Sequence, residues 1–311
     1  MKKKQIAVLI PCYNEELTIE KVINDFRKEL PDAKIYVYNN NSIDNSKEIA
    51  FNAGAIVVDE YKQGKGNVVS AMFSDIDADI YILVDSDDTY PAESIHMLVE
   101  PVVLGIADMV VGDRLSNGTY KSQNKRQFHR LGNNIVRRTV NILFKVNLKD
   151  IMSGYRVFNK DFVKNFPAIS KGFEVETEMT FHALDRNYRI IEIPINYRNR
   201  PNGSVSKLHT FKDGLKVITT IFRMYKDYKP LKFFGLIALI LCFISLNIGI
   251  PLVVDFFKTG IVTKFPSGIL ATGIMILSVF CFGLGIVLDS LVRHHKEELK
   301  IMGIINRKLY K

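Results

Sequence analysis

Residues 80–88 read IYILVDSDD, an apolar run that ends in a group of carboxylates. We interpret the apolar part as a strand. Similar runs occur at residues 6–10, 35–38, 55–58 and 109–111. Segments that favour helices lie at 15–30, 45–52, 67–74 and 92–103. This alternation predicts a parallel, doubly wound α/β sheet, in which ligands bind beyond the carboxyl ends of the strands.

Polar segments follow four of these strands. They read PCYNE at 11–15, NNNSID at 39–44, GKG at 64–66 and DSDD at 85–88. An acidic turn alone is more often a solvated loop. At the end of a strand, however, the carboxylates of Asp85 and Asp87 would gather at the edge of the site, where a divalent cation prefers oxygen ligands and substrate phosphates. The sequence therefore predicts a metal site here.

Further motifs continue through the first two thirds of the chain. They read DIMSGYR at 150–156, GFEVETE at 172–178 and RPNGSVSKL at 200–208. With these blocks in this order, the chain resembles the inverting family 2 glycosyltransferases, specifically the polyprenyl-phosphate sugar synthases related to dolichol-phosphate mannose synthase. The resemblance implies a Rossmann-like GT-A doubly wound sheet, followed by amphipathic interfacial helices and a two-helix transmembrane hairpin.

The resemblance also implies a nucleotide-sugar site on the Rossmann-like half. The residues expected there are Pro11, Tyr13, Glu15, Asn40, Asp44, Lys65 and Asp85. Mg²⁺ or Mn²⁺ on Asp85 and Asp87 would bridge the diphosphate and stabilise charge on the leaving nucleotide. Because Asn40 stands where many relatives are acidic, any base contact there is made by an amide. Lys65, between two glycines that let a backbone approach, could touch a phosphate or belong to an ordinary surface turn.

The acceptor chemistry can be argued from the substrate class. A lipid monophosphate is mostly dianionic at neutral pH, so its oxygen is already a nucleophile. The enzyme then needs positive charge for positioning more than it needs a strong base. Arginine suits this task because its planar fork binds phosphate oxygens in pairs. The resemblance implies acceptor contacts at Arg114, Arg130, Arg200 and Lys207, which lie in its matched blocks, with surface salt bridges as the alternative.

Asp150 stands where relatives carry a proposed catalytic aspartate. It could accept a proton, orient an arginine or the metal, or cap a helix. Asp87 and Arg156 complete the expected catalytic set. A displacement in line with the nucleotide would invert the anomeric centre, so an α-linked donor would yield a β-linked lipid phosphate sugar.

The last third of the chain differs in character from the rest. Residues 233–254 and 265–288 carry no charge, and each segment exceeds the roughly 20 residues that span a bilayer. We predict two transmembrane helices, with a pair of buried core helices as the alternative. Basic residues flank the outer ends of both segments, so the positive-inside rule places the catalytic domain and both termini in the cytosol. The expected location is the cytoplasmic membrane, as a multi-pass protein.

The predicted domain organisation follows from these segments. It comprises a cytosolic catalytic domain at 1–208 with an interfacial helix at about 125–145, an amphipathic interfacial helix at 209–230, the hairpin at 231–290 and a cytosolic basic tail at 291–311. The chain has 42 basic and 33 acidic residues, a net charge of +9. Basic residues beside the spans would face anionic lipid. Because nucleic-acid signatures do not stand out, we expect no nucleic-acid partner.

Three functions remain open at this stage. The leading one transfers a hexose, with glucose or N-acetylglucosamine favoured, from a nucleotide diphosphate sugar to polyprenyl phosphate such as undecaprenyl phosphate, for cell-envelope glycan modification. A mannose synthase that uses guanosine diphosphate mannose is its variant. A processive polysaccharide synthase would need more spans, and a catalytically silent scaffold would not need the acidic residues. Since two spans are too few to move the product across the bilayer, we expect a separate flippase and a downstream glycosyltransferase; homo-oligomerisation is a further hypothesis.

Overall fold

The computed structural model describes residues 4–118, 127–201, 203, 219, 222–223, 225–261 and 264–309, and it leaves out the side chains of 127–133, 296 and 299–309. The chain divides into two compact units, Met1–Thr220 and Ile221–Lys311. Three predictions fall outside this description: the side chain of Arg130, the residue Lys207 and most of the amphipathic helix at 209–230.

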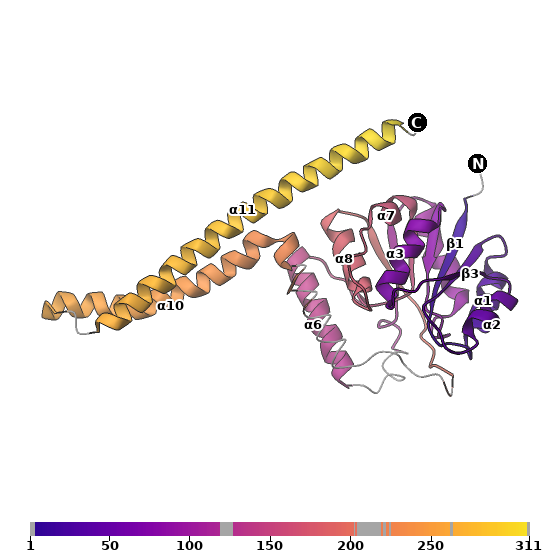
Figure 1. Ribbon diagram of the computed structural model, residues 1–311, viewed down its shortest axis with the longest axis horizontal. Coiled ribbons are helices and arrows are strands. Elements are labelled where there is room, and N and C mark those ends of the chain that lie inside the picture. The colour runs from indigo at the N-terminus through magenta and orange to yellow at the C-terminus, as the bar shows by residue number, and fades with distance from the viewer. Residues whose placement is uncertain are drawn as a thin grey trace. The chain divides into compact units, whose positions relative to one another are not determined.

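The first unit, drawn in Figure 1 with α1, α3 and β1 labelled, is an α/β unit. Its seven-stranded sheet has the order β3-β2-β1-β4-β6-β5-β7. Its strands are β1 (Ile6–Cys12), β2 (Lys34–Asn39), β3 (Ile56–Asp59), β4 (Ile80–Leu83), β5 (Met109–Asp113), β6 (Arg156–Asn159) and β7 (Ile190–Pro194). Strands β1 to β4 are parallel, as predicted, and β5 pairs with β7 in parallel. The predicted run of strands is therefore present, with β6 and β7 added to it.

The sheet is not parallel throughout, because β6, a strand that the sequence did not predict, runs antiparallel to both β4 and β5. Its first residue, Arg156, pairs with Leu83 at the end of β4 and with Val111 on β5. An antiparallel strand begins at the edge where its neighbours end. This reversal brings the loop that carries Asp150 to the carboxyl ends of the parallel strands, which a seventh parallel strand would not do.

Helices cover both faces of this sheet. They are α1 (Ile19–Glu29), α2 (Ser46–Asn52), α3 (Lys65–Asp75), η1 (Ala92–Ser94), α4 (Ile95–Val103), α6 (Gln127–Phe144), α7 (Lys160–Asn165) and α8 (Val175–Asp185). Alternate residues of β1 point to opposite faces. Val8 joins the core cluster that contains Phe26 of α1, whereas Leu9 joins the cluster that contains Phe73 of α3. Because both faces are packed, the strands carry nearly continuous apolar sequences.

His182 on α8 is enclosed by the rings of Phe162, Phe166 and Tyr188, at centroid distances of 5.5, 5.4 and 5.8 Å. Burial, with a smaller effect of Arg186, lowers the pKa of this histidine from 6.5 to about 4. The folded state therefore holds the neutral ring. The resulting stabilisation is present above pH 6.5 and is lost as the pH falls towards 4.

We expect wild-type protein to lose about 2 kcal/mol more unfolding free energy between pH 7 and pH 5 than a His182→Phe variant does. Urea titrations at both pH values measure this difference. His96 is the control because its side chain is exposed and pairs only at the surface with Glu29. A His96→Phe variant should follow the wild type. If the unfolding free energy of the His182→Phe variant depends on pH as strongly as that of the wild type, the expectation is contradicted.

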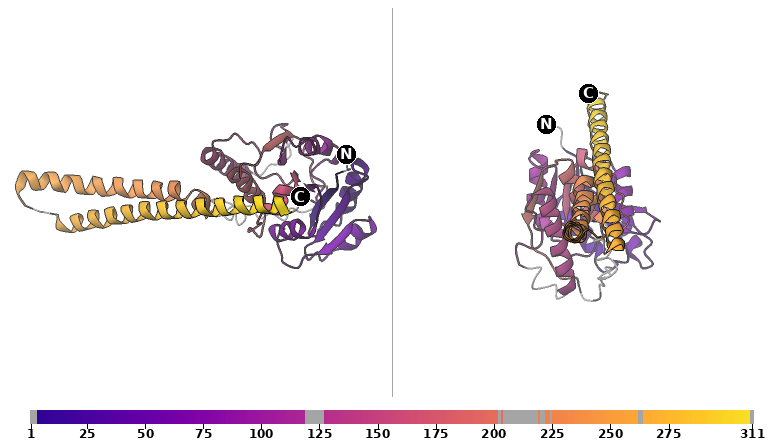
Figure 2. Two further views of the ribbon diagram at one scale, coloured as in Figure 1. Left: turned by 90° about the horizontal axis from the view of Figure 1, so that it is seen from above. Right: turned by 90° about the vertical axis from the view of Figure 1, so that its left-hand side faces the viewer.

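The second unit consists of α10 (Pro230–Thr259) and α11 (Phe265–Leu309), which lie side by side (Figure 2). Two helices, Pro230–Thr259 and Phe265–His295, are long and apolar enough to span a membrane. Only 11% and 17% of their most apolar windows are buried within the chain, which disfavours the alternative of two soluble core helices. Both helices extend beyond the predicted spans, and α11 continues to Leu309 through most of the predicted tail.

Two reciprocal hydrogen bonds join the helices of this hairpin. Ser245 Oγ donates to the carbonyl of Ala271 at 2.8 Å, and Ser278 Oγ donates to the carbonyl of Ala238 at 2.7 Å. The small side chains allow the backbones to approach, as is common between membrane helices. Gly285 contributes in the same way, since a Cβ there would lie 3.1 Å from Phe234 Cβ. The serines thus satisfy their own hydroxyls while holding the hairpin together.

Candidate active site at the carboxyl edge of the sheet

The ends of β1 and β4 meet the segment that follows β7. Arg200 Nη1 donates to Glu15 Oε1 at 3.0 Å, and its Nη2 donates to Asp87 Oδ2. Burial, reinforced by the nearby charge of Asp85, raises the pKa of Asp87. Arg200, which the sequence placed at the acceptor phosphate, therefore lies with the carboxylates expected at the nucleotide sugar.

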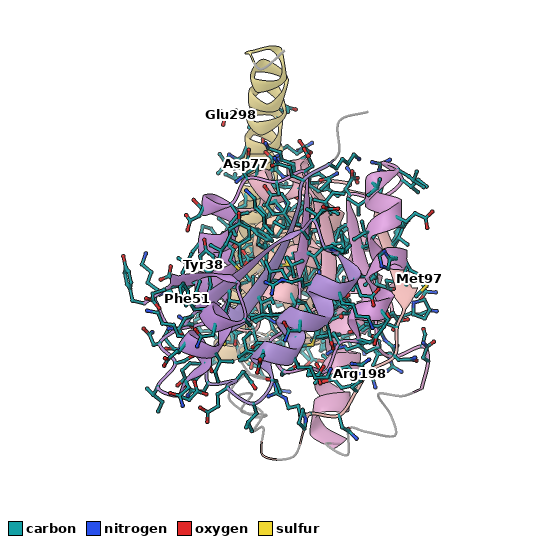
Figure 3. The ribbon with its side chains drawn as sticks, turned by 90° about the vertical axis from the view of Figure 1, so that its right-hand side faces the viewer. Tyr38, Phe51, Asp77, Met97, Arg198 and Glu298 are labelled. Carbon is teal, nitrogen blue, oxygen red and sulfur yellow. The ribbon has the colours of Figure 1, made fainter. Side chains whose placement is uncertain are left out.

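The last two carboxylates of the DSDD segment, Asp87 and Asp88, have different partners. Asp87 Oδ1 accepts hydrogen bonds from the backbone N–H of Thr89 at 3.2 Å and from its hydroxyl at 2.6 Å. Asp88 adopts a left-handed φ of 55° and pairs with Lys21 at 2.8 Å. Arg198, labelled in Figure 3, lies 3.6 Å from the same Asp88 oxygen and donates its backbone N–H to the Thr89 carbonyl. Asp88 is thus paired with two cationic side chains, Lys21 and Arg198.

Lys65, at the start of α3, is buried between two carboxylates. Its ammonium contacts Asp85 Oδ1 and Glu176 Oε1, both at 2.5 Å. The side chain of Lys65 is only 8% exposed, so the alternative of a surface turn is wrong. Burial acts to lower the pKa of Lys65, but Asp85 and Glu176 outweigh it and raise that pKa overall. Lys65 therefore remains charged and fixes Asp85 to α8.

The glycines beside Lys65 make room for the protein's own backbone. A Cβ on Gly66 would lie 1.9 Å from the carbonyl oxygen of Ser170, and one on Gly64 would lie 2.2 Å from that of Lys171. Gly66 also donates its N–H to Lys171 at 3.0 Å. These glycines therefore let the chain before α8 pack closely against the start of α3.

The remaining predicted donor-site residues surround this group. Asn40 donates to the carbonyls of Glu60 and Lys62 at 2.7 and 3.0 Å and accepts from Gly64 N at 2.8 Å, so its amide holds the 60–64 loop. Asp44 accepts from the backbone N–H of Ser46 at 3.0 Å, at the start of α2. Tyr13 is 38% exposed. Pro11 lies in β1, two residues before it. Among these four, only Tyr13 is exposed at the surface.

Asp150 forms a buried, bidentate ion pair with Arg114. Arg114 Nε donates to Asp150 Oδ2 at 2.7 Å, and Nη2 donates to Oδ1 at 2.8 Å. The two residues are only 3% and 8% exposed. Asp150 therefore orients an arginine, one of the alternatives left open above. A bidentate pair of this geometry holds the guanidinium plane in one direction.

The loop before β6 is supported from two sides. Glu192 of β7 accepts from the backbone N–H groups of Lys149 and Asp150, at 2.8 and 2.7 Å. Within the loop's own segment, Arg156 donates to the carbonyls of Ser153 and Ile151. Arg156 has no exposed surface, and burial lowers its pKa to about 10. This geometry does not support the predicted catalytic role of Arg156. Its side chain is wholly buried, and its hydrogen bonds stabilise the loop before β6.

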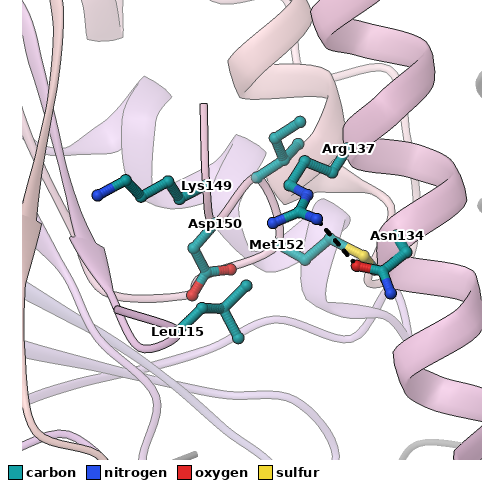
Figure 4. Close-up of a pocket in the computed structure, with 7 residues that line it drawn as sticks. Leu115, Asn134, Arg137, Lys149, Asp150 and Met152 are labelled. Carbon is teal, nitrogen blue, oxygen red and sulfur yellow. Dashed lines mark hydrogen bonds between the residues drawn. The ribbon is translucent and has the colours of Figure 1, made fainter. Parts of the chain in front are cut away.

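A small pocket opens beside Asp150 (Figure 4). Its lining residues are Leu115, Asn134, Arg137, Lys149, Asp150, Ile151 and Met152. Arg137 reaches in from α6 and donates to Asn134 Oδ1 at 3.2 Å, while Lys149 Nζ lies 3.2 Å from Ser116 Oγ. The lining of this small pocket therefore combines two cationic side chains with apolar ones.

Asp85 and Asp87 offer carboxylate oxygens of the kind that a hard divalent cation prefers, but they are only two residues. Within the described ranges, no group of three or more His, Cys, Asp or Glu side chains could hold a metal ion. Asp85 is the more accessible carboxylate, with 28% of its side chain exposed. Mg²⁺ and Mn²⁺ accept carboxylate ligands and complete their shells with water and substrate phosphates. Asp85 and Asp87 would supply two such carboxylates, but each is paired with a cation in this structure, Asp85 with Lys65 and Asp87 with Arg200.

Sequence reasoning missed several residues of this edge. Glu176 lies inside the quoted GFEVETE block, but nothing in the sequence separates it from Glu174 and Glu178. Tyr90 and Glu192 gave no signal, because their contacts join segments far apart in the chain. The Glu176 Oε2 atom is buried without a hydrogen-bond partner among the described residues, and burial raises the pKa of this carboxyl.

Comparison with known proteins identifies the class to which this fold and site belong. The model of Glycosyl transferase family 2 matches residues 7–166, and the chain belongs to this family. It is therefore a glycosyltransferase, as the sequence motifs predicted. The described sheet is also similar to a crystal structure of Mycobacterium tuberculosis glucosyl-3-phosphoglycerate synthase in complex with Mn²⁺ and UDP-glucose. That match has a TM-score of 0.57 and 20% identity and covers 70% of this chain and 79% of that one, which supports the GT-A fold.

Two curated proteins from Haloferax volcanii are similar to this chain over most of their own length. The Haloferax volcanii glycosyltransferase AglJ is 29% identical over 95% of this chain and 96% of its own length. The dolichyl-phosphate hexose transferase of the same organism is 28% identical over 70% of this chain and 93% of its own length. The family 2 relatives of this chain thus include transferases that act with polyprenyl phosphates.

Proposed function

We propose that this protein transfers a hexose from a nucleotide diphosphate sugar to a polyprenyl phosphate, with inversion at the anomeric carbon. A uridine diphosphate donor with glucose or N-acetylglucosamine is favoured, and guanosine diphosphate mannose is the alternative. The observation that carries the proposal is the position of the Asp150–Arg114 pair. It lies beside a cationic, partly apolar pocket, in a loop that reaches the same sheet edge as Asp85 and Asp87.

The donor side supports the proposal through its paired carboxylates. A bound Mg²⁺ or Mn²⁺ on Asp85 and Asp87 would stabilise the charge that develops on the leaving diphosphate. Lys65 holds Asp85 in place, and Thr89 holds one oxygen of Asp87. Arg200 would leave Asp87 and offer its guanidinium to the diphosphate oxygens. The crystallised glucosyl-3-phosphoglycerate synthase, which binds Mn²⁺ and UDP-glucose, is consistent with this donor chemistry.

The acceptor side supports the proposal through positive charge beside apolar surface. Arg137 and Lys149 of the pocket can bind a dianionic phosphate, and Leu115 and Met152 can contact the first isoprene units. Asp150 keeps the Arg114 guanidinium oriented. Because a phosphate dianion attacks without losing a proton, Asp150 acts mainly by positioning and electrostatics. The predicted contacts of Arg130 and Lys207 remain proposals.

The membrane-facing parts complete the proposal. We place α10 and α11 across the cytoplasmic membrane, with the catalytic unit and both ends of the chain on the cytosolic side, because basic residues flank the outer ends of the two apolar segments. We also propose α6 as an interfacial helix. A separate flippase and a downstream glycosyltransferase would then use the β-linked product in modifying a cell-envelope glycan. Homo-oligomerisation remains a hypothesis.

The direct test is transfer of label into lipid. Purified full-length protein in detergent is incubated with undecaprenyl phosphate, Mg²⁺ or Mn²⁺ and a panel of radiolabelled uridine and guanosine diphosphate sugars. We expect one donor to place label in the organic phase. Background label with every donor, together with background release of nucleotide, would refute the transferase and favour the catalytically silent scaffold.

Gly154 offers a specific prediction on the donor side. A Cβ at this position would lie 2.6 Å from Asp85 Oδ2, so a Gly154→Ala substitution must displace that carboxylate. We expect roughly tenfold weaker Mn²⁺ binding by electron paramagnetic resonance, and a similar fall in transfer, since one strong ligand is misplaced. Gly283→Ala is the control because its Cβ would meet nothing within 4 Å. Wild-type Mn²⁺ affinity in the Gly154→Ala variant would count against Asp85 as a metal ligand.

A further inference from the structure

The phenol of Tyr90 lies between the two halves of the proposed site. Tyr90 follows the DSDD segment and is 4% exposed. Its oxygen accepts a hydrogen bond from the backbone N–H of Gly154 at 2.9 Å and one from Arg114 Nη1 at 3.3 Å. One buried atom therefore contacts both the arginine that pairs with Asp150 and the glycine against which Asp85 packs.

The two residues that donate to Tyr90, Gly154 and Arg114, lie on the sides of different proposed substrates. Gly154 is the donor-side contact, because the Asp85 carboxylate lies so close to it that no side chain fits between them. Arg114 is the acceptor-side contact, because its guanidinium is fixed by Asp150 beside the cationic pocket. The phenol oxygen thus links the glycine beside the carboxylate proposed for the metal to the guanidinium proposed for the acceptor.

The surroundings of Tyr90 hold its ring in one position. Tyr155 and Tyr197 pack against it, with centroid distances of 5.3 and 5.7 Å. Burial raises the pKa of Tyr90, so the phenol stays neutral at any working pH. A neutral oxygen in a rigid ring is a fixed hydrogen-bond acceptor. Removing only this oxygen would remove the hydrogen bonds that Gly154 N–H and Arg114 Nη1 donate to it, while the ring packing stays intact.

We propose that Tyr90 is a positioning residue that holds the donor and acceptor halves of the active site in register. The proposal rests on the proposed transferase function. In-line displacement needs the attacking phosphate oxygen, the anomeric carbon and the leaving diphosphate to lie in one line, and errors of about 1 Å can be costly. Loss of the Tyr90 oxygen should therefore slow the reaction of bound substrates more than it weakens the binding of either one.

The experiment compares Tyr90→Phe with Tyr155→Phe. The Tyr155 hydroxyl is buried one ring away and has no hydrogen-bond partner among the described residues, so its loss is a matched control. For Tyr90→Phe we expect kcat to fall about tenfold, the effect of losing hydrogen bonds to a charged and a backbone donor, with KM for both substrates within about twofold. Tyr155→Phe should leave both constants at wild-type values.

A second readout does not depend on activity. Amide hydrogen exchange, followed by mass spectrometry on peptides covering residues 150–156, should become faster in Tyr90→Phe because the Gly154 N–H loses its acceptor. Tyr155→Phe should exchange at the wild-type rate. An unchanged kcat, a change confined to KM, or unchanged exchange in Tyr90→Phe would each overturn the inference. If wild-type protein transfers no sugar, the proposed function fails, and the exchange result still decides whether Tyr90 holds this loop.

Discussion

Transfer of sugar to polyprenyl phosphate should fall by roughly 10²- to 10⁴-fold in an Asp150→Asn variant, the range expected for loss of an essential charged group. Asp150 is 3% exposed and binds Arg114 through both carboxylate oxygens. The amide keeps the shape of the side chain but removes its charge and one of its two acceptors. Arg114 then loses one of the two side-chain hydrogen bonds that orient its guanidinium, so positioning of the phosphate is lost.

The loss must be separated from simple unfolding. Breaking a buried ion pair costs about 3 kcal/mol or more, so thermal melting of the Asp150→Asn variant has to be measured beside transfer. Asp108 and Arg189 form a pair of the same bidentate geometry, with the Arg189 side chain 57% exposed. An Asp108→Asn variant should therefore keep its transfer activity. If the folded Asp150→Asn protein transfers sugar at the wild-type rate, Asp150 has no role in the reaction.

A Lys65→Met variant should lose about 3 kcal/mol of stability, because it leaves the buried Glu176 carboxylate and the partly buried Asp85 carboxylate without their cation. For a unit of this size, we expect the melting temperature to fall by roughly 6–12 °C. Transfer should fall as well, since Asp85 is no longer held. The methylene stem of methionine keeps most of the packing, so charge is the main change.

Two further variants test the physical reason. Adding Glu176→Gln to Lys65→Met removes one of the uncompensated charges and should recover part of the melting temperature. Lys160 pairs with Asp77 at the surface, at 2.7 Å, so Lys160→Met should change stability by no more than about 0.5 kcal/mol. Equal effects of Lys65→Met and Lys160→Met would show that burial of the Lys65 group does not matter.

The fold could be predicted to a large extent because its signals are local. The apolar runs at 6–10 and 80–84 correspond to β1 and β4, and the polar segments after them lie at the predicted edge. The exception is β6 (Arg156–Asn159), which runs antiparallel to its neighbours. A four-residue strand has the same composition in either direction, so its orientation depends on the path of the chain before and after it.

The site could be predicted only as a set of residue types. Asp85, Asp87, Asp150 and Arg114 were all named from the sequence, but their partners were not. Arg200 was expected at the acceptor and lies on Asp87, and Arg156 was expected in catalysis and is buried beneath the loop. A motif records which side chains are present in one segment. The Arg200–Asp87 contact joins segments 113 residues apart in the chain, and the burial of Arg156 depends on elements that pack over it from elsewhere in the fold.

The sequence by itself determined the alternating α/β unit, the acidic strand ends and the two apolar helices, because hydrophobic periodicity and charge are properties of neighbouring residues. Only the tertiary structure decided which cation lies on which carboxylate. Lys65 meets Glu176 and Arg114 meets Asp150 because the sheet brings separate loops to one edge. Burial then strengthens each pair and makes it selective, since an unpaired charge at that depth is too costly to remain.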